Sequence, residues 1–105
     1  MGGAIIVFIT ADSKKTSKAI TKTILKNRLV ACVNEIPGIK SQYWWKGKLE
    51  KADEILLMAK TKKSRMKEII EEVKKIHPYE VPEIISIDIK DGNKDYLRWI
   101  EAETK

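Results

Sequence analysis

The segment from His77 to Pro82 holds three side chains whose types and spacing could do chemistry. The imidazole of His77, the phenol of Tyr79 and the carboxylate of Glu80 can exchange protons or bind a cation. Two prolines in this segment disfavour helix at the residues before them and remove backbone donors, so we predict a stiff, extended joint. This pattern is equally compatible with a functional site and with a rigid turn that has only a structural role.

Cys32 is the only cysteine of the chain, and catalysis by its thiolate would need His77 beside it. The apolar run of residues 31–33 favours a small buried side chain over a reactive one. One cysteine and one histidine cannot form a structural zinc site, although carboxylates such as Glu80 or Glu83 could complete a metal site with His77. A histidine at a helix end also favours the helix dipole, which makes a cap the alternative to a ligand. We predict that the protein is not an enzyme.

The composition of the 105 residues indicates one globular domain, residues 1–105, that needs no disulfide or metal to fold. The chain has 21 basic and 15 acidic residues, which gives a net charge of +6. We interpret the lysines as a solvated surface scattered among acids, and we predict no nucleic-acid partner. The first apolar run is far shorter than a membrane span, and together with the single cysteine this predicts a cytoplasmic protein without a membrane partner.

Apolar residues recur along the chain with the periods of strands and helices. Pro37 and Gly38 are expected to end the second strand, and residues 46–53 are expected to form a polar turn. The other predicted elements are strands over residues 4–10, 30–36, 54–60 and 81–89, an extended arm over 39–45, and helices over 14–29, 66–76 and around 96–100.

This order, βαββαβ with a C-terminal helix, is that of the ferredoxin-like α+β fold. Such a fold has a four-stranded antiparallel sheet with two helices on one face, and its other face needs a cover that one short helix does not provide. Self-association is the simplest cover. The aromatic residues Tyr43, Trp44 and Trp45 on the extended arm favour the same interpretation, because large exposed aromatics usually meet a partner.

Two activities found on this fold are disfavoured by the sequence. RNA-binding domains of this topology stack bases on aromatic residues of the central strands, whereas the matching strands here are aliphatic apart from Phe8. Acyl-phosphate hydrolysis needs an arginine and a tight anion-binding turn after the first strand. Residues 11–15 contain neither arginine nor glycine.

Five segments taken together resemble the CutA family of divalent-cation tolerance proteins. They are ACVN (residues 31–34), YWWKGKL (43–49), LMAKT (57–61), HPYEVP (77–82) and DYLRWI (95–100). The resemblance implies a ferredoxin-like homotrimer with hairpin arms that reach across to neighbouring subunits. It also implies a role in the response to metal ions, with copper(II) or another divalent cation as the bound ion.

The resemblance places one metal ligand, His77, on this chain. Copper-binding bacterial members use a cysteine at the end of the first strand and a pair of histidines before Pro-Tyr. In this chain Ile9 occupies the position of the cysteine, and Ile76 occupies the position of the first histidine. Only His77 is carried over. The ion is then held by His77 with carboxylates and water, or this member uses no metal.

A second hypothesis follows from the likeness of such trimers to PII-type signalling proteins. In it the chain is a small-molecule sensor whose cleft between subunits is lined by Trp45, Lys60, Tyr79 and Glu80 and binds an anionic or nucleotide-like ligand. A third hypothesis is a scaffold in which the aromatic arm only assembles the trimer.

Overall fold

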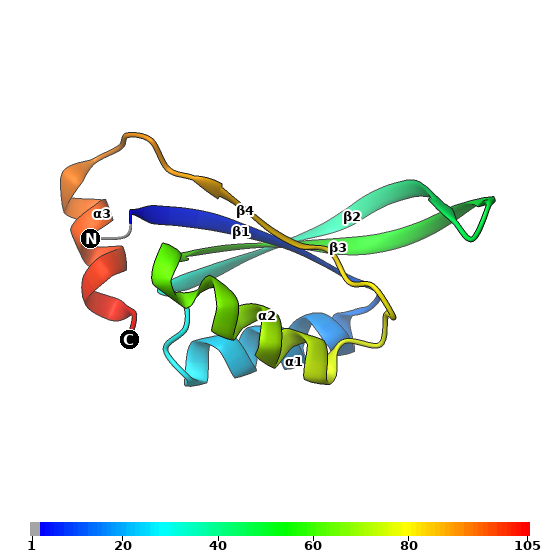
Figure 1. Ribbon diagram of the computed structural model, residues 1–105, viewed down its shortest axis with the longest axis horizontal. Coiled ribbons are helices and arrows are strands. Elements are labelled where there is room, and N and C mark those ends of the chain that lie inside the picture. The colour runs from blue at the N-terminus through cyan, green and yellow to red at the C-terminus, as the bar shows by residue number, and fades with distance from the viewer. Residues whose placement is uncertain (1–2) are drawn as a thin grey trace.

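The chain folds into one antiparallel sheet with two helices side by side on one face (Figure 1). The computed structural model describes residues 3–105, and its element order confirms the predicted ferredoxin-like α+β fold. No helix of the described part is long and apolar enough to cross a membrane. The elements are β1 (Ala4–Ala11), α1 (Lys14–Lys26), β2 (Cys32–Trp45), β3 (Lys48–Lys62), the 3-10 turn η1 (Lys63–Arg65), α2 (Met66–Ile76), β4 (Ile84–Asp88) and α3 (Lys94–Glu103). The strands lie in the order β2-β3-β1-β4.

Alternate residues of β1 face the helices and form the centre of the core. Ile5, Val7 and Ile9 are almost completely buried, because successive side chains of a strand point to opposite faces. The helices complete the core with apolar residues three or four positions apart, which are Ile20 and Ile24 of α1 and Ile69 and Val73 of α2. The apolar residues that recur with a helical period in the sequence therefore form the face of each helix that packs on the sheet.

β2 does not end at Pro37 and Gly38 as predicted. The two residues form a bulge between Ile36 and Ile39, and pairing with β3 resumes beyond it. Gly38 has φ 79°, a left-handed conformation that glycine adopts without strain. The bulge thus joins the predicted strand and the predicted extended arm into one strand, Cys32–Trp45.

The polar turn predicted over residues 46–53 is also wrong. Lys46 and Gly47 alone connect the two strands, and both have positive φ, 49° and 81°. Positive φ at both central residues matches the tight two-residue turn that fits the twist of a hairpin. β3 therefore begins at Lys48, six residues before the predicted start.

α1 ends at Lys26, three residues before its predicted end. The chain reverses at Arg28, which has φ 53°. The amide of Arg28 donates to the carbonyl of Leu25 (3.0 Å), and the amide of Leu29 donates to the carbonyl of Ile24 (2.9 Å). This pair of bonds satisfies the last carbonyls of the helix and is a common way to stop one.

β4 is shorter than predicted, since it covers Ile84–Asp88 and not residues 81–89. Pro82 has no amide hydrogen to donate to a neighbouring strand, and Val81 is exposed. The residues between α2 and β4 are therefore an irregular connection.

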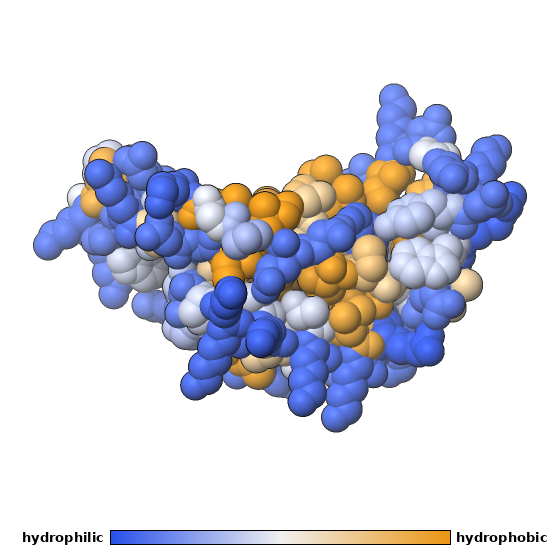
Figure 2. Space-filling model, turned by 180° about the vertical axis from the view of Figure 1, so that it is seen from behind, coloured by the Kyte–Doolittle hydropathy of each residue, from blue (hydrophilic) through white to orange (hydrophobic). Residues whose placement is uncertain are grey.

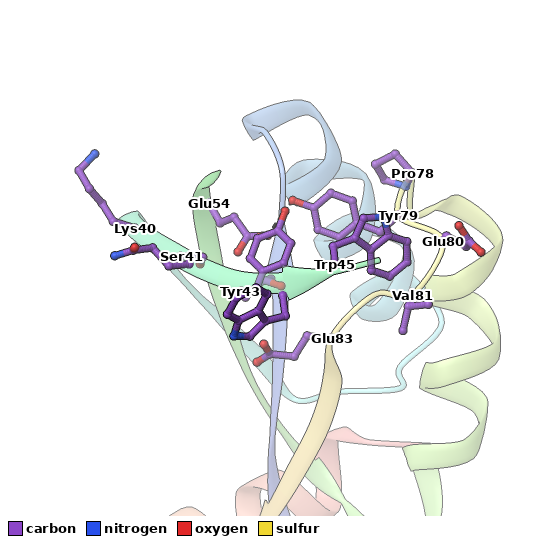
Figure 3. A pocket seen from close by; sticks show the side chains of 13 residues that line it. Lys40, Ser41, Tyr43, Trp45, Glu54, Pro78, Tyr79, Glu80, Val81 and Glu83 are labelled. Atoms are coloured by element: carbon purple, nitrogen blue, oxygen red, sulfur yellow. Dashed lines mark hydrogen bonds between the residues drawn. The ribbon is translucent and has the colours of Figure 1, made fainter. Parts of the chain in front are cut away.

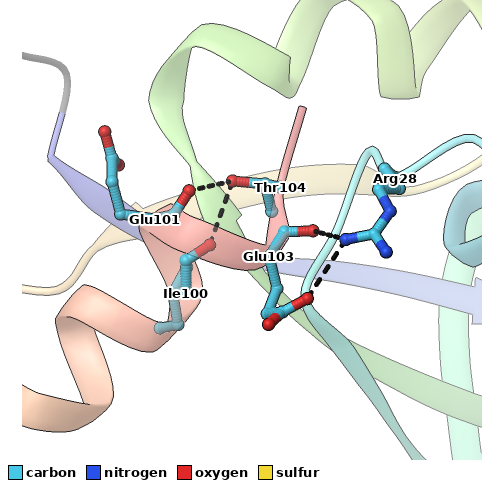
Figure 4. Close-up of polar contacts among 5 residues, drawn as sticks. All are labelled: Arg28, Ile100, Glu101, Glu103 and Thr104. Carbon is cyan, nitrogen blue, oxygen red and sulfur yellow. Dashed lines mark hydrogen bonds and ion pairs between the residues drawn. The ribbon is translucent and has the colours of Figure 1, made fainter.

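The C-terminal end of α3 is fastened to the loop between α1 and β2 (Figure 4). The guanidinium of Arg28 donates to the backbone carbonyl of Glu103 (3.3 Å) and pairs with its carboxylate (3.1 Å). The amide of Lys105 donates to the carbonyl of Arg28 (2.9 Å), and the buried hydroxyl of Thr104 donates to the carbonyl of Ile100 (3.0 Å). These bonds hold α3 against the end of the sheet.

The sheet face turned away from α1 and α2 is apolar. Residues paired across strands share a face, and Phe8 pairs with Ile85 while Ile6 pairs with Ile87. The two β4 isoleucines are 53% and 52% exposed, and α3 reaches this face only at one end, where Tyr96 touches Cys32. Figure 2 shows apolar side chains gathered in the hollow between the two ends of the molecule. We call this surface the open sheet face, made by Ile6, Phe8, Leu56, Met58, Ile85 and Ile87.

Replacing Ile24 by alanine removes a fully buried side chain and is expected to lower the free energy of unfolding by about 2–5 kcal/mol. Its neighbour Leu25 is 40% exposed and provides the matched control, so that Leu25→Ala should cost less than about 1 kcal/mol. Guanidinium unfolding at one fixed protein concentration measures both variants. Equal losses would contradict the packing of α1 described above.

Candidate functional site

The end of β1, the β2–β3 hairpin and the connection after α2 enclose an open cleft with a volume of about 930 Å³ (Figure 3). Tyr43, Glu54 and Tyr79 project into it from three different segments. The predicted joint therefore borders a cavity large enough for a small ligand. The full lining is Thr10, residues 40–45, Glu54, residues 78–81 and Glu83.

His77 is a buried cap at the end of α2. Its amide donates to the carbonyl of Val73 (2.9 Å), which closes the last turn of the helix. In the ring, Nε2 lies 2.7 Å from the carbonyl oxygen of Thr10, and Nδ1 lies 3.2 Å from the amide nitrogen of Tyr79. A carbonyl only accepts and an amide only donates, so the imidazole is neutral with its proton on Nε2.

This geometry does not fit a copper(II) site at His77. A metal ion needs a nitrogen lone pair, and the lone pair of Nδ1 already accepts from the amide of Tyr79. Ile9, which is fully buried, and Ile76 offer only hydrocarbon. Residues 3–105 contain no group of three or more His, Cys, Asp and Glu side chains placed to hold a metal ion. Coordination by His77 would require one of its two hydrogen bonds to break.

The strongest polar contact of the cleft joins Tyr79 to Glu54. The phenol of Tyr79 donates to Oε2 of Glu54 at 2.6 Å, and Glu54 is only 7% exposed. Burial, this hydrogen bond and the negative charge of Glu54 raise the pKa of Tyr79 above its usual range. The ring of Tyr79 also packs near the imidazole of His77, with ring centres 4.7 Å apart. Tyr79 is thus held as a neutral donor to a buried carboxylate.

Acidic side chains dominate the charge of the cleft. Glu54, Glu80 and Glu83 line it, and burial followed by the charge of Glu54 raises the pKa of Glu83. The lining lysine, Lys40, is paired with Asp53 at 2.8 Å. Glu80 is itself paired with Lys46 at 4.0 Å, so the uncompensated negative charge lies at Glu54 and Glu83 and favours a cation there.

The structure brings together three of the four residues predicted for the cleft. Trp45, Tyr79 and Glu80 line it, whereas Lys60 lies outside it. The ammonium group of Lys60 donates to the side-chain oxygen of Asn34. Within one chain, Lys60, the basic residue expected to bind an anionic ligand, is therefore separated from the other three residues.

Cys32 and His77 are too far apart to act together. Cys32 pairs with Lys60 of β3, whereas His77 bonds to Thr10, which pairs with Leu56. Four residues of strand span about 13 Å. The sulfur of Cys32 instead lies 3.7 Å from the hydroxyl of Tyr96, and the thiol is half-buried.

Glu54 is a central residue of the cleft that the sequence does not predict. It was expected only as the first residue of a strand over 54–60. The only sequence signal for a role of Glu54 is that this glutamate begins an apolar run. This signal does not distinguish a buried carboxylate from a solvent-exposed one. Its partner Tyr79 lies 25 positions later in the chain.

Tyr79→Phe removes the donor to Glu54 and leaves a buried carboxylate oxygen without its partner. We expect the free energy of unfolding to fall by about 1–3 kcal/mol at neutral pH. Tyr96→Phe is the matched control, because that hydroxyl contacts only a sulfur atom at 3.7 Å, a weak interaction. Chemical unfolding of the two variants makes the comparison, and a Tyr79→Phe protein as stable as Tyr96→Phe would refute a structural role for this bond.

Comparison with known proteins agrees with the fold and the motifs. Residues 5–103 match the family model described as CutA1 divalent ion tolerance protein. The chain is 43% identical to the divalent-cation tolerance protein CutA of Pyrococcus horikoshii, and the match covers 96% of this chain and 98% of that protein. It is 42% identical to the chloroplastic protein CutA 1 of Oryza sativa subsp. japonica over 97% of this chain, but it spans only 58% of the length of the rice protein.

A solved structure is equally similar. The divalent cation tolerance protein (Cut A1) from Thermus thermophilus superposes with a TM-score of 0.94 at 39% sequence identity, and the match covers 97% of this chain and 99% of that one. The sequence and the fold thus give the same answer over almost the whole length, and the chain belongs to the CutA1 family of divalent ion tolerance proteins.

Proposed function

We propose that this chain serves divalent-cation tolerance by binding a divalent cation and that it catalyses no reaction. The names of its relatives from Pyrococcus horikoshii and Thermus thermophilus support the first part. The separation of Cys32 from His77 supports the second, because it leaves the thiol without the base that a nucleophile needs.

The observation that carries the proposal is the acidic lining of the cleft. Burial, followed by the charge of Glu54, raises the pKa of Glu83, so a further negative charge next to these two residues is unfavourable. A bound cation would remove this repulsion. Oxygen ligands suit hard cations such as Mg²⁺ and Mn²⁺, which are often held by one or two carboxylates together with water. We therefore propose such a cation, and not copper(II) at His77, as the ion bound by this chain.

The acidic lining weighs against the sensor hypothesis. An anionic or nucleotide-like ligand would meet Glu54, Glu80 and Glu83 in the cleft, and Lys60 lies outside it. Repulsion would be strongest beside the buried Glu54, since Glu80 and Glu83 are exposed and better screened by water. A cation is the better electrostatic match.

We also propose that three copies assemble around the open sheet face. Its half-exposed isoleucines, Ile85 and Ile87, and the 72% exposed Trp44 on the hairpin are costly to leave in water and support a subunit interface. Assembly would place side chains of a neighbour beside the cleft, which has room for further cation ligands. The cytoplasmic location inferred from the sequence is kept as part of this proposal.

Isothermal titration with Mn²⁺ tests the cation site. Glu83→Gln should weaken binding by about tenfold or more, because it removes a lining carboxylate that feels the charge of Glu54. His77→Gln should bind as well as the unaltered protein, since the amide can replace the hydrogen bonds of the ring. Glu50→Gln, on the exposed hairpin and outside the lining, controls for the lost charge.

The same titration has a defined pH dependence. The pKa of Glu83 is raised, so its carboxylate gains a proton at a higher pH than an ordinary glutamate. Binding of Mn²⁺ should weaken as the pH falls through that raised pKa, and ions bound at a pH near or below it should displace protons from the carboxyl group. The carboxylate site would be contradicted if Glu83→Gln bound Mn²⁺ as tightly as the unaltered protein, or if only His77→Gln lost affinity for Mn²⁺.

Light scattering coupled to size-exclusion chromatography tests the assembly. The unaltered protein should elute with three times the chain mass of 12.1 kDa. Ile85→Glu should give monomers, because it places a charge in the centre of the open sheet face. Leu25→Glu adds the same charge on α1, at a residue 40% exposed, and should leave the trimer intact. A monomeric unaltered protein would end this part of the proposal.

A further inference from the structure

α1 carries most of the net charge of the protein. Its 13 residues include five lysines and no acid, so it supplies five of the six net positive charges of the chain. The other lysines are spread over the rest of the chain as expected, and α1 is a local exception. We call these residues the lysine flank: Lys14, Lys15, Lys18, Lys22 and Lys26.

All five ammonium groups are exposed to solvent, and none is in an ion pair with another residue of the described part of the chain. In contrast, α2 has three glutamates among its charged residues, and two of them pair with a basic neighbour. The lysine flank is therefore a local concentration of uncompensated positive charge.

Four of the lysines form a row that winds around the helix by about 40° at each step. Lys14, Lys18, Lys22 and Lys26 are each four positions apart, which places them about 6 Å from one another and about 18 Å from end to end. The opposite side of α1 is fixed in the core by Ile20 and Ile24, so the row has a rigid base.

A shallow hollow of about 300 Å³ runs beside this row, between α1 and β2. Lys18, Thr21 and Lys22 line it on the helix side, and Val33 and Glu35 line it on the strand side. The buried hydroxyl of Ser17 donates to the carboxylate of Glu35 and orients it, but the negative charge of Glu35 remains. The acidic side chains of a ligand would therefore lie on the lysine side of the hollow. The hollow gives an extended ligand a place to lie along the lysines.

We propose that the lysine flank docks an extended, acidic segment of a partner protein. In an extended chain, alternate side chains point the same way about 6.6–6.8 Å apart, close to the spacing of the row. Carboxylates on alternate residues would each meet one ammonium group. This surface is on the helix side of the sheet, opposite the open sheet face, so it stays available in the assembly proposed above and does not depend on cation binding.

Other polyanions fit the flank less well. α1 has no aromatic residue on which a base could stack and no arginine for two-pronged phosphate binding. Its apolar side is buried in the core, so it has nothing to insert into a lipid bilayer. An acidic peptide needs neither feature.

Fluorescence anisotropy with a labelled decapeptide of alternating glutamate and serine tests the proposal. A variant with glutamine at Lys14, Lys18, Lys22 and Lys26 should bind the peptide about tenfold more weakly or worse. A control variant with the same loss of charge at other exposed positions, Lys67, Lys74, Lys90 and Lys94, should bind within about twofold of the unaltered protein. Added salt should weaken binding to the unaltered protein.

Three results would overturn the proposal. The two variants could lose affinity equally, which would mean that net charge alone attracts the peptide. The matching glutamine–serine peptide could bind equally well. Vesicles rich in phosphatidylserine or an oligo-dT strand could bind more tightly than the acidic peptide at the same ionic strength, and the partner would then be of a different class. Circular dichroism confirms that both variants are folded.

Discussion

The imidazole of His77 joins parts of the molecule that are distant in the sequence. Its ring donates to Thr10 on the central strand and accepts from the amide of Tyr79, while its own amide closes the last turn of α2. A buried ring with two fixed partners has one orientation, so the chain can leave the helix along only one path. That path sets the phenol of Tyr79 against Glu54, and the shape of the cleft follows from it.

The protein separates its charges by location. Three glutamates line a cleft at the end of the sheet, while five lysines occupy one helix without an acid among them. Exposed charges are screened over about 10 Å in physiological salt, so local charge decides what approaches each surface. A chain with a net charge of +6 can therefore offer a site for a cation and a separate surface for an anion.

The sequence predicted those parts of the fold that depend on apolar periodicity. The alternation in β1 and the helical period in α2 both reflect the single buried face that each element turns to the core. It failed where the backbone has positive φ at an unusual residue: Lys46 begins the hairpin turn and Arg28 ends α1, and neither type is a usual signal for that conformation.

The site was predicted less well than the fold, because its geometry depends on contacts between distant residues. The joint over residues 77–82 was recognised, but the partner that orients its phenol, Glu54, lies on another strand. Lys60 is predicted to line a cleft between neighbouring subunits, and within one chain the register of β2 and β3 places it beside Asn34 and Cys32. The regular spacing of these lysines is visible in the sequence, but its meaning depends on the folded structure, in which residues 3–105 form no ion pair with them.

The bulge at Gly38 changes which residues of β2, even-numbered or odd-numbered, point to a given face of the sheet. Ile36 and Ile39 pair with Leu56 and Glu54, which lie two positions apart and so share a face of the sheet. Even-numbered residues occupy that face before the bulge and odd-numbered residues after it, which brings Tyr43 to the side of Glu54. Loss of one of the two bulge residues would leave an unbroken ladder in which Ile39 still pairs with Glu54. The side chains of the outer arm would then keep their faces, and the strand would lose only the local bend and twist that the bulge imposes.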